Sequence, residues 1–133
     1  MKQVLYVITK DDAGGAQKYV RDLAANLDPQ KFHAEILYGG THGARFLSNT
    51  FMPYFLFLND LVALLELTFT FYKKQPDVVH LNSSKAGVIG ALAARLCQLI
   101  NSSTHQLKTV FTAHGWVFNP TNALSLFRRK FYI

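Results

Sequence analysis

The feature that most constrains the fold is a repeated alternation of short apolar runs with longer segments of helical period. Residues 4–9 read VLYVIT, a continuous apolar run typical of a strand that is covered on both faces. Gly14 and Gly15 interrupt the pattern before helical spacing takes over. The apolar positions that then recur at this spacing are Val20, Leu23, Ala24 and Leu27.

The same alternation continues along the rest of the chain. Further strands are predicted at residues 33–40, 54–58, 77–82 and 108–113. Helices are predicted from Asn59 or Asp60 to about Lys74, from Ser83 and Ser84 to Ile100, and along a final stripe of Leu124, Phe127 and Phe131. Strands alternating with helices in this way predict an α/β fold, a Rossmann-like parallel sheet with helices on both faces.

Composition limits the chain to one ordinary domain with a real core. The sequence has 133 residues, of which 50% are hydrophobic and 17% charged, values typical of a globular protein rather than a disordered one. The single cysteine, Cys97, excludes an internal disulfide and fits a reducing compartment. Its apolar neighbours predict a buried thiol.

A net charge of +6 favours anionic partners such as phosphorylated ligands, nucleic acid or anionic membranes. The basic residues are scattered, and the dense run at residues 128–130 is interpreted as a solvated helix face. We therefore expect no nucleic-acid partner. The apolar stretch 51–72 contains Pro53, Asp60 and Glu66, so a strand followed by a helix is favoured over a membrane-embedded segment.

Three groups of residues are expected at the carboxyl ends of strands, where open parallel sheets bind ligands. The first is the glycine pair Gly14 and Gly15, and the second is the run Ser83, Ser84 and Lys85. Backbone amides at a helix start, hydroxyls and a lysine can all hold phosphate or sugar oxygens. The third is His114, which can hydrogen-bond a sugar hydroxyl or a phosphate oxygen, with Trp116 close behind it.

Plainer interpretations stand beside each group. The glycines fit an ordinary tight turn, and neither a full G-x-G-x-x-G nor a P-loop pattern is present. The serines fit a helix cap with a solvated lysine, and Trp116 could simply anchor its loop in the core. His80, inside a strand, fits a core histidine with its hydrogen bonds satisfied. No metal site is expected, since the remaining histidines, His33, His42 and His105, lack ligand spacing.

Taken together, three segments resemble a known family. VLYVITKDDAGGAQKYVRDLA, PDVVHLNSSKAGVIGALAARL and TVFTAHGWVF are similar to the N-terminal domain of retaining glycosyltransferases with two Rossmann-like domains (GT-B type). The closest likeness is to bacterial enzymes that build polysaccharides and lipid-linked saccharides. The resemblance covers most of the chain and preserves the order and spacing of the three motifs.

The resemblance implies roles for particular residues. In the family, the glycine-rich loop approaches the donor phosphate, which here implies Gly14 and Gly15, and a histidine contacts the donor sugar, which implies a catalytic role for His114. The residues Ser83, Ser84 and Lys85 would border the cleft. Transfer in the family needs no metal or other cofactor, and the nucleotide-sugar is the substrate.

The resemblance also implies an organisation for the whole chain. Residues 1–133 are expected to form one N-terminal, acceptor-side domain that is incomplete at its C-terminus and lacks the donor-binding domain. The expected function is hexosyl transfer to a saccharide or lipid-linked acceptor in polysaccharide biosynthesis, inactive in this chain alone. Expected partners are that acceptor and a separate donor-domain polypeptide, in the cytoplasm or at the inner membrane face with peripheral membrane association. The alternatives are a non-catalytic interaction module and an unrelated Rossmann-like nucleotide binder.

Overall fold

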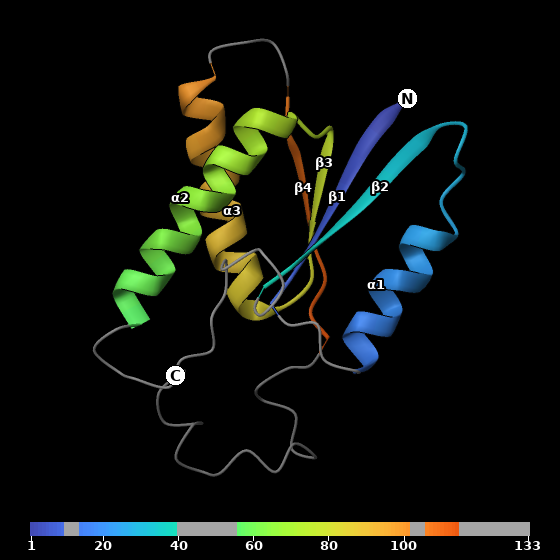
Figure 1. Ribbon diagram of the computed structural model, residues 1–133, viewed down its shortest axis with the longest axis horizontal. Coiled ribbons are helices and arrows are strands. Elements are labelled where there is room, and N and C mark those ends of the chain that lie inside the picture. Colours follow the sequence, from blue (N-terminus) through green and yellow to red (C-terminus); the bar gives the residue numbers. More distant parts are fainter. Residues whose placement is uncertain (10–13, 40–55, 102–105, 115–133) are drawn as a thin grey trace.

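The computed structural model describes residues 1–9, 14–39, 56–101 and 106–114 (Figure 1). Strands and helices alternate along the chain, as the sequence predicts. They follow in the order β1 (Lys2–Ile8), α1 (Gly15–Ala25), β2 (Phe32–Tyr38), α2 (Leu56–Lys74), β3 (Val78–Leu81), α3 (Ser84–Ile100) and β4 (Lys108–Phe111).

The strands form one parallel sheet in the order β2-β1-β3-β4. Helix α1 covers one face, while α2 and α3 lie side by side on the other (Figure 1). This arrangement confirms the predicted Rossmann-like sheet with helices on both faces. It also brings the carboxyl ends of β1, β3 and β4 to one edge of the sheet, because parallel strands all end on the same side.

The central strand β1 contributes side chains to two separate hydrophobic cores, which explains its unbroken apolar sequence. Leu5 and Val7 pack with residues of α2, α3 and β3. The alternate residues of the strand point the other way: Val4, Tyr6 and Ile8 pack with Val20 of α1. Because successive side chains leave opposite faces of a strand, a strand covered on both faces needs apolar residues at every position.

The start of α2 corrects one prediction. A strand was expected at residues 54–58, but residues 56–58 already belong to α2, and residues 54 and 55 lie outside the described residues. Periodicity alone cannot distinguish a short, wholly apolar run as strand or buried helix, and here the helix continues for several turns beyond it. The predicted end at Lys74 is confirmed: Gln75 takes a left-handed φ of 46° and Pro76 follows.

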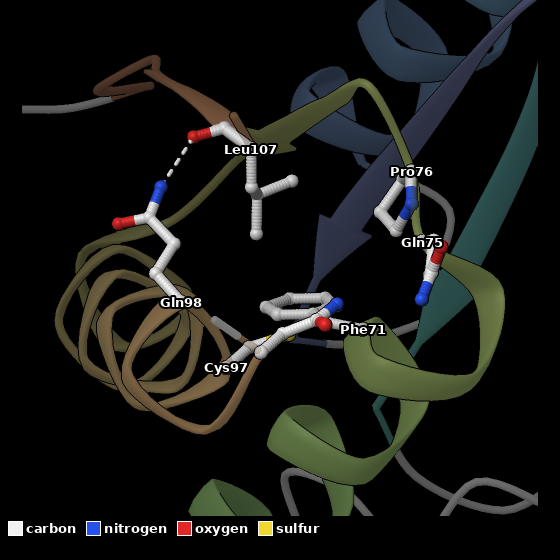
Figure 2. A pocket seen from close by; sticks show the side chains of 7 residues that line it. Phe71, Gln75, Pro76, Cys97, Gln98 and Leu107 are labelled. Carbon is white, nitrogen blue, oxygen red and sulfur yellow. Dashed lines mark hydrogen bonds between the residues drawn. The ribbon is translucent and has the colours of Figure 1, made fainter. Parts of the chain in front are cut away.

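A small hollow lies beside this helix end, near the amino ends of β3 and β4. Figure 2 shows Phe71, Pro76 and Cys97 around it, with Gln98 Nε2 donating to the Leu107 carbonyl at 2.8 Å. Its volume of about 10 Å³ leaves room for about one water molecule. It is therefore a packing feature and not a ligand site, and Cys97 is the buried thiol that the sequence predicts.

Helix α2 also exposes apolar side chains to solvent. They are Leu61, Val62, Leu65, Phe69 and Tyr72, which we call the α2 stripe. Exposure is greatest at Phe69, at 65%. Among the described residues, no helix is both long enough and apolar enough to cross a membrane.

Two glycines of α3 give a matched test of the packing against the sheet. A Cβ at Gly90 would collide with the buried side chain of Leu81, whereas one at Gly87 would meet only the ring edge of the exposed Phe111. Both Gly→Ala changes gain the same helix propensity. Because Leu81 cannot move aside, Gly90→Ala should be less stable than Gly87→Ala by about 1–3 kcal/mol in urea unfolding. Equal stabilities would contradict this packing.

Candidate functional site

The segments that follow β1 and β3 meet at the carboxyl edge of the sheet. Thr9 Oγ1 donates to Ser83 Oγ over 2.9 Å. The same Ser83 oxygen accepts from the Ala86 backbone amide at 3.1 Å, so Ser83 is the N-cap of α3, as predicted. These two bonds join the end of β1 to the start of α3.

The glycine pair lies at the start of α1 on the same edge. Gly14 is the N-cap, in extended conformation at φ −134° and ψ 169°, and Gly15 opens the helix. A Cβ on Gly15 would meet nothing within 4 Å, so this position is open to solvent. The first turn contains no acidic side chain, and the positive end of its helix dipole favours an anion beside it.

His114 lies in the loop after β4 and contacts both the loop after β3 and helix α1. Its Nε2 lies 3.3 Å from Oδ1 of Asn82, the residue that follows β3. Its ring meets Tyr19 of α1 edge-on, with 4.9 Å between ring centroids. The exposed His114 therefore lies between the helix that follows the glycines and the loop that contains Ser83.

Beneath this edge, His80 fills a half-buried position within β3. Its Nε2 lies 2.8 Å from Thr112 Oγ1, and its ring packs against Tyr6 at 5.3 Å between centroids. Burial, and then the nearby His114, lower the pKa of His80 below its ordinary value. The expectation of a histidine with a hydrogen-bond partner inside the strand agrees with these contacts.

The predicted run after β3 divides between different surroundings. Ser83 belongs to a group of polar and aromatic residues at the carboxyl edge, which we call the edge cluster: Thr9, Tyr19, Asn82, Ser83, Thr112 and His114. Lys85 lies outside it, because its Nζ forms an ion pair with Asp60 Oδ1 of α2 at 2.6 Å. That oxygen otherwise has no hydrogen-bond donor among the described residues. The exposed Ser84 lines a shallow, mainly apolar groove of about 420 Å³ between α3 and β4, with Val88 and Phe111. This groove is thus beside the edge cluster rather than in it.

Four residues of the cluster were not found by sequence reasoning: Thr9, Tyr19, Asn82 and Thr112. Three of them, Thr9, Asn82 and Thr112, directly follow a strand that ends at this edge. Their polar character immediately after an apolar run was the signal that could have indicated them. Tyr19 carried no such signal, because its contact with His114 depends on how α1 lies against the sheet.

The assembled groups suit a ligand with hydroxyl and phosphate groups. The Thr9 and Ser83 hydroxyls, the His114 imidazole and the amides at the start of α1 lie at this edge, and each of these groups can hydrogen-bond an oxygen of such a ligand.

Comparison with protein families identifies the class. The model of Glycosyltransferase Family 4 matches residues 13–133. The chain belongs to glycosyltransferase family 4. The matched region includes Gly14, Gly15 and His114. A search of curated proteins found no match.

Family 4 membership confirms the glycosyltransferase resemblance drawn from the three motifs. Other predicted positions fall outside the described residues, namely Trp116, His42, His105 and the basic run 128–130. Of the remaining histidines, His33 is exposed on β2, away from the edge cluster.

The lowered pKa of His80 predicts a pH dependence of stability in this family 4 chain. The unfolded histidine titrates near 6.5, so at that pH the unfolded state binds more protons than the folded state. The contribution of His80 should be complete above pH 6.5 and be lost as the pH falls toward its folded-state pKa. Urea unfolding between pH 5 and 8 measures it.

The variant His80→Gln should lose part of this pH dependence, while His33→Gln at the exposed β2 position should keep all of it. Identical pH profiles for His80→Gln and the unmodified chain would show that His80 titrates normally.

Proposed function

We propose that the chain is the acceptor-side domain of a retaining hexosyltransferase that extends a saccharide or lipid-linked acceptor in polysaccharide biosynthesis. The bond between the anomeric carbon and the nucleoside diphosphate breaks, and the diphosphate leaves with the electron pair. A new bond forms from that carbon to an acceptor hydroxyl oxygen, whose proton passes to the departing phosphate or to water. In the proposed reaction a donor-binding domain holds the nucleotide.

The contacts of His114 with helix α1 and with the loop after β3 are the observation that supports this proposal most. The imidazole touches Asn82 after β3 and Tyr19 of α1, while Thr9 and Ser83 are bonded beside it. The glycine-led helix and the histidine lie at one edge of this family 4 chain, which supports binding of phosphate and sugar side by side.

Each part has a definite task in the proposed reaction. The amides at Gly14 and Gly15 stabilise the charge that develops on the leaving phosphate. His114 hydrogen-bonds the transferred sugar, and Ser83 and Ser84 border the space for the acceptor. Lys85 is assigned to holding α2 through Asp60 rather than to the ligand.

A reconstituted transfer assay tests the proposal. Residues 1–133 on their own should give no transfer from labelled nucleotide-sugars to bacterial membranes, because no donor-binding domain then positions the donor against the acceptor. Adding a donor-domain polypeptide from a family 4 enzyme should restore transfer. His114→Ala should then lower transfer about 10- to 100-fold through loss of a hydrogen bond to the sugar.

The control is His33→Ala, which removes a histidine from the exposed face of β2 and should leave transfer unchanged. Transfer that survives His114→Ala undiminished would refute the assigned site. Binding of the donor-domain polypeptide with no transfer at all would favour the non-catalytic interaction module.

We further propose that the α2 stripe rests on an anionic membrane, where lipid-linked acceptors reside. The stripe presents Leu65 and Phe69 to solvent, at 58% and 65% exposure, and the exposed Lys73 follows at its end. Apolar side chains combined with positive charge, here a net +6, are the pattern of helices that lie in the membrane interface.

Sedimentation with phosphatidylglycerol vesicles tests this surface. Phe69→Glu should lower the bound fraction several-fold, because it places a charge in the apolar contact. Val110→Glu is the matched control, since Val110 pairs with His80 and lies on the face opposite α2. If Phe69→Glu instead converts a dimer to a monomer in light scattering, without changing vesicle binding, the stripe serves a second copy of the chain and the membrane proposal fails.

A further inference from the structure

The side chain of Asn82 is wholly buried directly under the exposed imidazole of His114. Its exposed fraction is 0%, and its backbone amide donates to the Val7 carbonyl at 2.8 Å. The residue is therefore fixed to the centre of the sheet between β1 and β3. A buried carboxamide at this position must satisfy both its oxygen and its nitrogen.

The hydrogen bonds of Asn82 determine which way its amide faces. Its Nδ2 lies 2.9 Å from the carbonyl oxygen of His80. A carbonyl can only accept, so the group facing it must be the amide nitrogen, and Oδ1 must face the other way. The atom that lies 3.3 Å from His114 Nε2 is that oxygen.

An amide oxygen in turn determines the proton on the ring. Since Asn82 Oδ1 can only accept, His114 Nε2 must carry a hydrogen to bond it. In the neutral imidazole the other nitrogen, Nδ1, is then bare and can only accept. The contact with Tyr19 on α1 limits rotation of the ring away from this arrangement.

We infer that Asn82 is a positioning residue that holds neutral His114 with its proton on Nε2 and leaves Nδ1 as the acceptor for a ligand hydroxyl. Resting on the proposed function, this makes the group met by His114 a sugar hydroxyl rather than an ionised phosphate oxygen. The phosphate is then left to the amides at the start of α1. Asn82 acts through His114 and does not itself touch the ligand.

Nitrogen NMR of the ring-labelled chain tests the inference without any substrate. The ring couplings of His114 should show the proton on Nε2, more completely than those of the exposed His33, which samples both forms in water. A proton on Nδ1 of His114 in the unmodified chain would overturn the inference, and this measurement needs no variant to fold.

Two substitutions separate positioning from mere folding. Asn82→Asp keeps the acceptor and adds a charge, so the pKa of His114 should rise by about 1–3 units. Among the described residues, the other titratable rings facing His114 are His80 and Tyr19, and neither is altered. Asn82→Leu removes the acceptor, so His114 should approach the behaviour of His33.

The matched control is Gln30→Glu, which adds the same charge before β2, at the opposite edge of the sheet. It should leave His114 unchanged. An unshifted His114 pKa in Asn82→Asp would overturn the inference. These ring measurements do not depend on transfer. A negative result in them would therefore leave the proposed function intact, and a failed transfer assay would leave the positioning role of Asn82 intact.

Discussion

Parallel pairing of β1 with β3 joins segments that are far apart in the sequence. The pairing sets Val7 beside Leu81, and the residues that follow, Thr9 and Ser83, are then close enough to hydrogen-bond although they are 74 positions apart. The same register gives Asn82 its backbone bond to Val7. Among the described residues, His114 contacts this framework through Asn82 and Tyr19.

Much of this framework could be predicted from apolar periodicity and capping residues. The sheet class, the Ser83 cap and the end of α2 are all confirmed. The predicted start of α2 was wrong because a short apolar run has the same sequence pattern in a strand as in a buried helix. The partners of His114 could not be predicted, since a contact between Nε2 and Asn82 depends on strand register and side-chain rotamers that no local pattern encodes.

The structure also sorts residues that the sequence could only group. Ser83 and Lys85 are two residues apart, yet one belongs to the edge cluster and the other is held by Asp60 of α2. A helix start turns successive side chains about 100° apart around its axis, so neighbours in a motif need not face the same space. Membership in glycosyltransferase family 4 identifies the class of chemistry, whereas these orientations identify which side chains are available for it.

The central claim is that phosphate and sugar share the carboxyl edge of the sheet. Amide NMR of the labelled chain, titrated in turn with UDP-glucose, UDP-N-acetylglucosamine and GDP-mannose, tests it most directly. The account predicts that the binding nucleotide-sugar shifts the signals of Gly14, Gly15, Asn82 and His114 and leaves those of Gln30 at the opposite edge unchanged. Shifts that gather at that opposite edge or along the α2 stripe, with Gly14 and His114 unaffected, would contradict it.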